Sequence, residues 1–378
     1  MQKLMGKKKI KSIGILSAGG DCPGLNAAIR GVAKAAMHHG IRCVGVLDGF
    51  RGLVENRFND LNDMRVSGIL TQGGTLLGTS RDKPQRMKIG DKTMDMTEVA
   101  VANARKANIE CLVCLGGNGT QKNALRLQEA GLPVITLPKT IDNDVWGTDV
   151  TFGYDSGLNI ATDAIDRLHT TATSHHRIIL CEIMGHDAGW LTLGAGIAGG
   201  ADVVLIPELP YDLNVVAEHL HNRRRSGKRF SIIAVAEGVQ AVDKTGNGDP
   251  KAAKKKKKKA GKTTEQKTDD GHALMVEPTV NRIARELTEH TGFEARTTSL
   301  GHVQRGGCPT ATDRLLCTRL GTKVGDLLVA GRFNVMVAVR GNDCVPVALE
   351  DVGGKIRLVP KDHEWIRTAR LVETCFGD

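Results

Sequence analysis

Short apolar runs alternate with amphipathic stretches along most of the chain, and this alternation limits the possible folds more than any other feature. Each run has the length of one buried strand, and apolar residues recur at helical spacing between the runs. We expect strands at residues 12–17, 42–47, 111–115, 134–137, 177–184, 202–206, 231–236, 296–300 and 334–340. We expect helices at residues 24–38, 98–106, 120–130, 158–168, 188–198, 213–225, 277–290, 311–329 and 362–373. The sequence therefore predicts an α/β protein with two doubly wound Rossmann-like lobes and an active site in the cleft between them.

Composition supports cores of this kind. Of 378 residues, 40% are apolar but only 3% are aromatic, so the cores must be aliphatic. A net charge of +10 is typical of proteins that bind nucleic acid. Half of that excess lies in one stretch, however, because residues 243–270 contain ten lysines and five acidic residues, a net charge of +5. We therefore expect no nucleic-acid partner and interpret residues 243–271 as a disordered, lysine-rich insertion. Weak binding of that insertion to anionic surfaces is the alternative.

The cysteines and the hydropathy pattern indicate a cytoplasmic protein. Cys111 and Cys114 form a lone Cys-x-x-Cys inside an apolar run, where residues three apart point to opposite faces of a strand. Because no second pair is available to complete a zinc site, we expect buried, reduced thiols. No run of 18 apolar residues is present, and no apolar region follows the basic first eleven residues. We expect neither a membrane span nor a signal peptide.

Three glycine-rich turns are candidates for phosphate binding. Residues 16–26 join the first strand to the first helix, residues 116–120 follow another strand, and residues 73–81 end in an arginine. Glycine lets the backbone approach a ligand closely, and a helix N-terminus offers free N–H groups. The first turn matches neither the dinucleotide nor the P-loop motif, and alone it could be a plain tight turn. Three such turns, all interpreted as lying at strand ends, predict a bound polyphosphate.

Two carboxylates follow the apolar run 133–137. In extended backbone, Asp142 and Asp144 would point to the same side, at the carboxyl end of a strand where α/β sheets place their ligands. Such a pair can hold a divalent cation and accept a proton from a hydroxyl. A plain Asp-Asn-Asp turn is the alternative interpretation.

Basic residues in the second half of the chain suit an anionic phosphoryl group. Arg177 begins one strand, Met-Gly-His (184–186) ends it, and Glu237 ends another. Residues 296–307 bring arginine and histidine together beside glycines. Arginine supplies planar paired donors, and histidine supplies a titratable ring. Singly, each of these residues could be a surface ion pair, a turn histidine or a helix cap.

Together these segments resemble the 6-phosphofructokinase family of the A type, with a mixed Gly/Lys pattern. The resemblance covers residues 11–326 apart from the lysine-rich insertion and continues weakly to the end. The matching motifs are Gly-Gly-Asp-Cys-Pro-Gly-Leu-Asn (19–26), Gly-Thr-Ser-Arg (78–81), Gly-Gly-Asn-Gly-Thr (116–120), Pro-Lys-Thr-Ile-Asp-Asn-Asp (138–144), Glu-Ile-Met-Gly-His (182–186) and Gly-His-Val-Gln-Arg-Gly-Gly (301–307). The resemblance implies Mg²⁺-dependent transfer of the terminal phosphoryl group of ATP to the 1-hydroxyl of fructose 6-phosphate, in glycolysis. Diphosphate (PPi) is the alternative donor.

The resemblance also implies a division of the chain and a role for each motif. It implies a donor-binding lobe at residues 1–153, a fructose-6-phosphate lobe at 154–303 and a C-terminal segment, 304–378, that packs back across both. Asp142 would be the general base, with Lys139 supporting the transition state. Donor contacts would be Gly20, Arg81, Gly117, Asn118, Gly119 and Thr120, and the metal ligands Asn118 and Asp144. Substrate contacts would be Thr140, Asp142, Asp144, Arg177, Met184, Gly185, His186, Glu237, Arg296, His302 and Arg305.

Family members take the equivalents of Arg177 and Arg296 from a neighbouring subunit, so the resemblance implies a homodimer or homotetramer. Two residues depart from the family pattern. Asn118 replaces an Asp and ligates a cation more weakly, and His186 replaces an Arg. The donor signals are mixed, because Gly119 accompanies ATP in the family whereas Lys139 accompanies diphosphate. We expect ATP, since Gly119 leaves space for its α-phosphate.

Two other functions compete with this hypothesis. A kinase of the NAD or lipid type shares a similar glycine turn but does not need the cluster 296–305. A catalytically silent regulatory subunit would keep the fold and lose the base, whereas Asp142 is intact.

Overall fold

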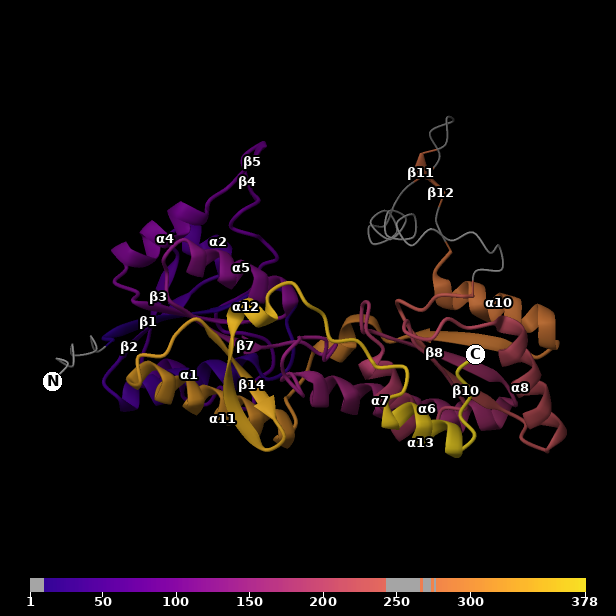
Figure 1. Cartoon of the computed structure of the whole chain (residues 1–378). Coiled ribbons are helices and arrows are strands. Elements are labelled where there is room, and N and C mark those ends of the chain that lie inside the picture. Colours follow the sequence, from indigo (N-terminus) through magenta and orange to yellow (C-terminus); the bar gives the residue numbers. More distant parts are fainter. Residues whose placement is uncertain (1–9, 243–265, 268–272, 275–276) are drawn as a thin grey trace. The chain divides into compact units, whose positions relative to one another are not determined.

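The computed structural model describes residues 10–242, 266–267, 273–274 and 277–378 and divides into two compact units (Figure 1). The first unit takes the described residues of Met1–Ile160 together with His302–Leu358, and the second takes those of Ala161–Gly301 and Val359–Asp378. The predicted disordered insertion, residues 243–271, lies outside the described residues except for β11 (Gln266–Lys267), which pairs antiparallel with β12 (Ala273–Leu274).

The first unit contains a seven-stranded sheet in the order β15-β14-β7-β6-β1-β2-β3. Its strands are β1 (Ser12–Ser17), β2 (Arg42–Val46), β3 (Phe58–Leu61), β6 (Cys111–Gly116), β7 (Val134–Pro138), β14 (Val335–Arg340) and β15 (Asp343–Ala348). The five central strands are parallel, and the two edge strands are antiparallel to their neighbours. β1 and β6 are buried along their whole length, as the apolar runs predict for a sheet covered on both faces.

Helices cover both faces of this sheet. They are α1 (Leu25–His38), α2 (Gly49–Val54), α3 (Asp63–Val66), α4 (Thr97–Lys106), α5 (Asn118–Glu129), α11 (Ala311–Val329) and α12 (Leu349–Val352), with a short hairpin of β4 (Met87–Ile89) and β5 (Lys92–Met94). Figure 1 shows α1 and α11 on one face and α2, α4 and α5 on the other. A Cβ at Gly321 would lie 2.4 Å from the carbonyl carbon of Gly31, so α1 and α11 pack backbone to backbone. Glycine is required at that crossing because any larger side chain would separate the helices.

A buried carboxylate ties α11 to the start of α6 (Tyr154–His175). Asp313 accepts hydrogen bonds from the Gly153 and Ser156 N–H groups, both at 2.9 Å, and from the Ser156 hydroxyl at 2.6 Å. Burial raises the pKa of Asp313, and these hydrogen bonds oppose the rise. The carboxylate satisfies N–H groups that an isolated helix N-terminus would leave unpaired.

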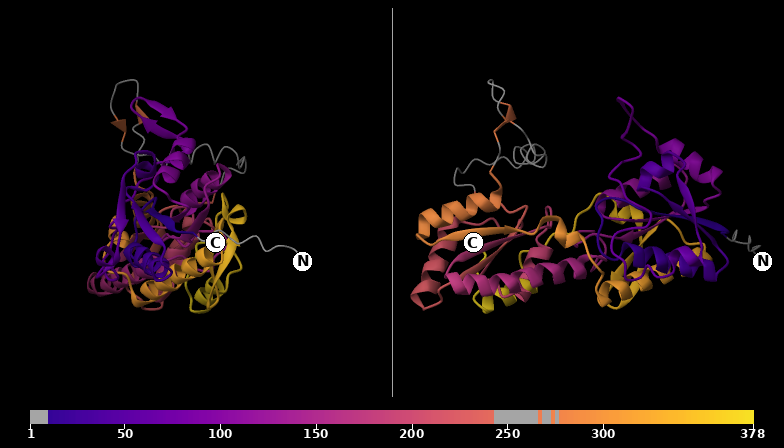
Figure 2. Two further views of the ribbon diagram at one scale, coloured as in Figure 1. Left: turned by 90° about the vertical axis from the view of Figure 1, so that its left-hand side faces the viewer. Right: turned by 180° about the vertical axis from the view of Figure 1, so that it is seen from behind.

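The second unit contains a four-stranded, fully parallel sheet in the order β13-β8-β10-β9. Its strands are β8 (Ile178–Ile183), β9 (Val203–Leu205), β10 (Ser231–Ala236) and β13 (Ala295–Ser299). Its helices, besides the later part of α6, are α7 (Trp190–Ala198), α8 (Leu213–Arg225), α10 (Thr279–Thr291) and α13 (Glu364–Leu371). Residues of α8 and α10 share one apolar core with β8, β9 and β10. Figure 2 shows the ribbon from two further sides. The predicted pair of parallel α/β lobes is therefore confirmed.

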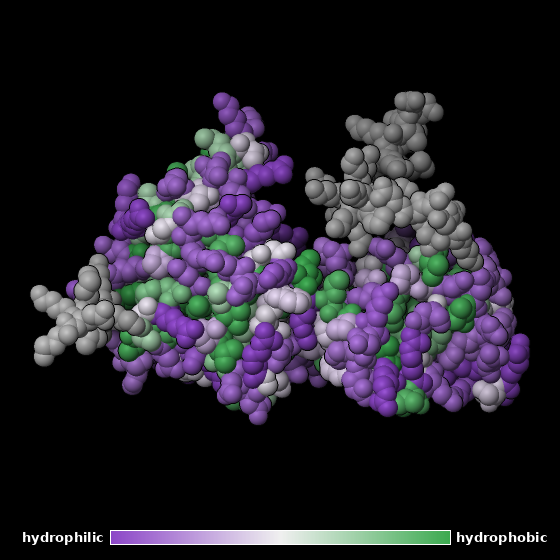
Figure 3. Space-filling model, viewed as in Figure 1, coloured by the Kyte–Doolittle hydropathy of each residue, from purple (hydrophilic) through white to green (hydrophobic). Residues whose placement is uncertain are grey.

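The cysteines agree with the prediction of buried thiols. Cys111 and Cys114 are fully buried in β6, and none of the nine cysteines forms a disulfide. No helix among the described residues is both long enough and apolar enough to cross a membrane. On the face shown in Figure 3, apolar residues are scattered among polar ones.

Candidate active site

The turn between β1 and α1 is the centre of the site in the first unit. Gly19 and Gly24 adopt φ values of +86° and +102°, which favour glycine. The N–H of Gly19 donates to the Ser80 carbonyl at 2.9 Å, and the Thr79 hydroxyl donates to the Gly19 carbonyl at 2.7 Å. The predicted third turn, 73–81, is thus joined to the first. It follows α3, so the prediction that all three turns lie at strand ends was wrong. Arg81, at its end, is exposed.

The second turn reaches the same centre. β6 ends at Gly116, Gly117 caps α5, and the Thr120 hydroxyl donates to the Ala18 carbonyl at 3.3 Å. A Cβ built at Gly119 would meet no atom within 4 Å, so the first turn of α5 faces open space. Unpaired N–H groups and the positive end of a helix dipole facing open space suit a phosphate group.

Two cations also contact the first turn. The buried Lys139 ammonium donates to the Gly20 carbonyl, and the Arg305 guanidinium donates to the Asp21 carbonyl at 3.1 Å. A Cβ at Gly20 would lie 2.3 Å from a terminal nitrogen of Arg305, so a larger residue would push the guanidinium away. The sequence predicts Arg305 as a sugar-phosphate contact; in the structure its guanidinium lies against the first glycine-rich turn.

Lys139 is a buried lysine, and burial changes the pKa of its ammonium group. Burial lowers the pKa of the Lys139 ammonium, and the nearby Arg305 charge acts in the same direction. The Cys22 thiol and Asp142 oppose the shift, and burial raises the pKa of Cys22 itself to about 12. A buried ammonium fixed on a backbone carbonyl forms a preorganised positive site beside the turn.

The predicted carboxylates lie in a bent loop and not in extended backbone. The chain bends at Ile141 and Asp142, and Asn143 adopts a left-handed φ of +52°. The prediction that extended geometry points both carboxylates to one side was therefore wrong. Burial nevertheless alternates, because Asp142 and Asp144 are half-buried while Ile141, Asn143 and Val145 are buried.

Hydrogen bonds fix the loop at residues 140–145, which the sequence predicts to be catalytic. The Asp142 N–H donates to the Thr140 hydroxyl at 3.1 Å. The Thr151 hydroxyl donates to the Thr140 carbonyl at 2.7 Å, and the Thr151 N–H donates to the Asn143 side-chain oxygen at 3.0 Å. Thr140 therefore orients the loop through its hydroxyl as well as lying beside the predicted substrate position.

Asn118 and Asp144 meet at the mouth of this loop. The Asn118 amide donates to an Asp144 carboxylate oxygen at 2.7 Å and to the Asp144 carbonyl at 3.2 Å. The Asn118 Oδ1 atom is buried and accepts no hydrogen bond. An oxygen left unsatisfied beside a carboxylate fits a hard divalent cation. Among the described residues, no group of three or more His, Cys, Asp or Glu side chains would hold a metal alone. Mg²⁺ commonly takes one or two protein ligands together with substrate phosphates.

In the second unit, two groups of predicted residues lie at opposite ends of the sheet. Met184, Gly185 and His186 follow β8, Glu237 follows β10, and the His186 N–H donates to the Glu237 carboxylate at 2.7 Å. Arg177 precedes β8, whereas Arg296 lies near the start of β13. Because these strands are parallel, both arginines lie far from the carboxyl ends.

Glu294 holds the two arginines. It lies 2.6 Å from Arg177 and 2.5 Å from Arg296, and these partners lower the pKa of its carboxyl. Sequence reasoning missed Glu294, which directly precedes β13 and lies two residues before Arg296. His302, which belongs to the first unit, is exposed.

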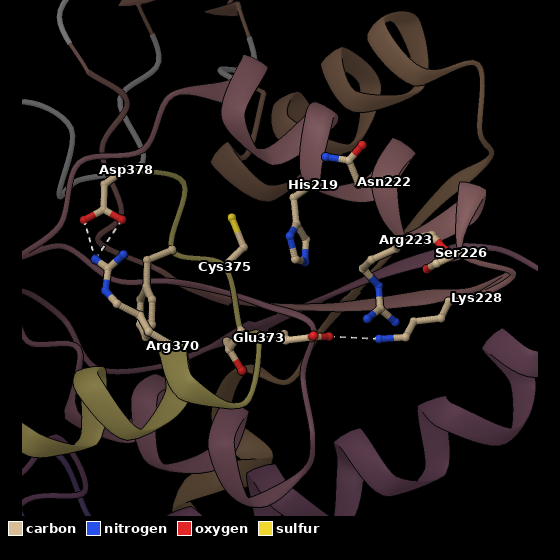
Figure 4. A pocket seen from close by; sticks show the side chains of 11 residues that line it. His219, Asn222, Arg223, Ser226, Lys228, Arg370, Glu373, Cys375 and Asp378 are labelled. Carbon is tan, nitrogen blue, oxygen red and sulfur yellow. Dashed lines mark hydrogen bonds and ion pairs between the residues drawn. The ribbon is translucent and has the colours of Figure 1, made fainter.

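A separate cavity of about 510 Å³ lies in the second unit between the end of α8 and the C-terminal residues (Figure 4). Its cations are paired, with Lys228 at 3.2 Å from Glu373 and Arg370 at 2.6 Å from Asp378. None of the predicted site residues lines this cavity.

Comparisons with known proteins agree with this geometry. Residues 12–328 match the family model for phosphofructokinase. An ATP-dependent 6-phosphofructokinase of Propionibacterium freudenreichii is 53% identical over 371 residues, which is 97% of this chain and 99% of the relative. The enzyme of that name from Spirochaeta thermophila is 48% identical over 380 residues, covering 99% of this chain and 100% of the relative.

Solved structures show the same fold. Pichia pastoris phosphofructokinase in the T-state has a TM-score of 0.76 and 29% identity, covering 91% of this chain but only 35% of the longer Pichia chain. A pyrophosphate-dependent phosphofructokinase from Marinobacter aquaeolei has a TM-score of 0.75 at 19% identity, covering 93% of this chain and 86% of that one. The fold and the site are those of a two-unit α/β phosphotransferase. The chain belongs to the phosphofructokinase family, which confirms the predicted resemblance.

Proposed function

We propose that this chain is an ATP-dependent 6-phosphofructokinase that phosphorylates the 1-hydroxyl of fructose 6-phosphate in glycolysis. One observation carries the proposal. The first turn, the start of α5 and the loop at residues 140–145 follow β1, β6 and β7, which are adjacent strands of one sheet. Phosphate-binding turns and a pair of carboxylates are thereby gathered at a single carboxyl edge, where such sheets bind their ligands.

In this proposal the side chains and helix start stabilise negative charge on the phosphates, and one carboxylate accepts a proton. Asp142 accepts the proton of the sugar hydroxyl as that oxygen attacks the terminal phosphorus of ATP, whose bond to the bridging oxygen breaks so that ADP leaves. Lys139 and the first turn of α5 stabilise negative charge on the donor phosphates. Asn118 Oδ1 and Asp144 would hold Mg²⁺, which supplies positive charge beside the phosphates when bound.

The remaining predicted residues would bind the substrates. Gly20, Gly117, Gly119, Thr120 and Arg81 would contact the donor. The sugar-phosphate contacts would be Thr140, Asp144, Arg177, Met184, Gly185, His186, Glu237, Arg296, His302 and Arg305. The open space in front of Gly119 supports ATP, because a nucleotide needs more room along the phosphate chain than diphosphate does.

Side-by-side initial rates test the proposal. The purified chain is supplied with fructose 6-phosphate, Mg²⁺ and either ATP or diphosphate, and fructose 1,6-bisphosphate is detected through aldolase. We expect turnover with ATP, loss of turnover with EDTA, and restoration by Mg²⁺. Turnover with diphosphate but not ATP would refute the donor. Retained fructose 6-phosphate binding in calorimetry with no turnover from either donor would indicate a silent regulatory subunit.

We also infer that the chain works as a homodimer or homotetramer. Arg177 and Arg296 lie at the opposite end of the second unit's sheet from Met184, Gly185 and Glu237, which supports their use in a neighbouring copy's site. Sedimentation during turnover should show a species of at least two chains. A fully active monomer of 40.5 kDa would contradict this proposal. The cytoplasmic location stays a prediction that cell fractionation checks.

A further inference from the structure

A segment from near the end of the first unit lies along the loop at residues 140–145. After α12 the chain returns beside residues 143–145, and Ile356 forms an antiparallel bridge with Val145. The Arg357 N–H donates to the Asp144 carbonyl at 2.8 Å. The Arg357 side chain donates to the Asn143 carbonyl at 3.1 Å. Arg357 thus binds two consecutive carbonyls of the loop that carries both carboxylates, and it lies beyond the residues 12–328 that match the family model.

These two carbonyls determine how the loop bends. Asn143 has a left-handed φ of +52°, so the peptide groups on either side of it turn sharply. The Asn143 side chain is bound by Thr151, which fixes the inner side of the turn. Its main-chain oxygen faces Arg357 instead. The carbonyls that Arg357 binds belong to the peptide groups on either side of Asp144, so a rotation of either would redirect the Asp144 side chain and disturb the bend at Asn143, which directly follows Asp142.

The surroundings of Arg357 favour a single conformation of its side chain. Its side chain is half-buried, and burial lowers the pKa of the guanidinium, while Asp149 and Tyr154 oppose that shift. An arginine keeps its charge in such surroundings, and its planar donors lose little freedom for each hydrogen bond formed. A charge-assisted hydrogen bond to a carbonyl is stronger than a neutral one.

We propose that Arg357 is a positioning residue for phosphoryl transfer, holding the Asn143–Asp144 backbone so that Asp142 and Asp144 keep their working orientations. This inference rests on the proposed function. It assigns no contact between Arg357 and a substrate. Misplacing reacting groups by about 1 Å can cost roughly 10²-fold in rate, so loss of this contact should act mainly on turnover.

The experiment compares Arg357→Ala with Arg357→Lys and Arg340→Ala in the full chain. Arg340 is a matched control, because this arginine is in the same unit, contacts Asp149 at 3.1 Å and has an exposed side chain. We expect Arg357→Ala to lower kcat by roughly 10- to 100-fold, with KM for fructose 6-phosphate within about threefold. Millimolar ethylguanidinium should restore part of the lost kcat. Arg340→Ala should stay within about twofold of the unsubstituted chain.

Each possible result supports or overturns the positioning role of Arg357. Wild-type kcat in Arg357→Ala overturns the inference, and so does an equal loss in Arg340→Ala. If Arg357→Ala does not fold, Arg357→Lys decides, because its ammonium can still donate to the Asn143 carbonyl. A folded Arg357→Lys variant with kcat within about fivefold supports positioning, while a rise in KM alone overturns it. If the unsubstituted chain does not phosphorylate fructose 6-phosphate, the proposed function itself fails.

Discussion

Asp142→Asn should lower kcat by roughly 10²- to 10⁴-fold while fructose 6-phosphate binding stays nearly intact. The amide has the shape of the carboxylate but cannot accept the proton of the attacking hydroxyl. The Asp142 N–H already bonds the Thr140 hydroxyl, so the loop keeps that backbone contact in the variant. Steady-state rates with ATP give kcat, and calorimetry gives the dissociation constant of the sugar phosphate.

Asp149→Asn is the matched control for this substitution. Asp149 is a carboxylate of the same unit whose side chain is about half-exposed and pairs with Arg340. An exposed ion pair contributes only about 0–1 kcal/mol, so the control should keep near-normal kcat and stability. Equal turnover in Asp142→Asn and the unsubstituted chain would remove Asp142 from the role of general base.

Gly119→Asp should abolish most ATP-dependent activity without unfolding the chain. A Cβ at this position meets no atom within 4 Å, so the new carboxylate extends into the space that the proposal gives to the nucleotide phosphates. Like charges brought together cost several kcal/mol, which predicts a loss of roughly 10²-fold or more in kcat/KM for ATP. An acidic residue in the first turn of a helix stabilises it by about 0.3–1 kcal/mol, so Tm should not fall.

Gly119→Ala separates charge from volume. Its methyl group enters the same open space with no charge, so its loss in kcat/KM for ATP should be much smaller. Both variants are measured with ATP and with diphosphate. An unchanged kcat/KM for ATP in Gly119→Asp would show that the donor phosphates do not pass this helix start.

The sequence predicted the central strands well because of how parallel sheets are covered. β1, β6, β8 and β10 lie largely inside cores, so their apolar runs are nearly continuous and easy to recognise. The missed elements include α2, β3, α3, the β4–β5 hairpin, β15 and α12. β3 and β15 are partly exposed edge strands; β3 carries no apolar run, and a proline interrupts the apolar run of β15. Local sequence contains little information about such strands, since their positions depend on the neighbour they pair with.

The motifs name candidate site residues but do not predict the contacts that those residues make. The sequence predicts extended backbone at residues 142–144, but asparagine tolerates the left-handed conformation, and the structure has a bend at Asn143. Arg305 and Gly20 are brought together only by the fold, and Arg357 is 214 positions from Asn143 along the chain. Hydropathy and spacing do not reveal a hydrogen bond between such distant residues. Those contacts follow from strand order, which local patterns leave undetermined.

The first unit is built from two separated stretches of the chain, and most of the second unit, Ala161–Gly301, is synthesised between them. During translation, β7 leaves the ribosome about two hundred residues before its partner strand β14 does, as their paired residues Ile135 and Val335 show. Until then, one edge of a growing parallel sheet has no neighbour, and α1 lacks α11. A nascent chain that stalls after β13 would therefore expose the apolar surface that these late elements bury, which makes it a natural substrate for chaperones.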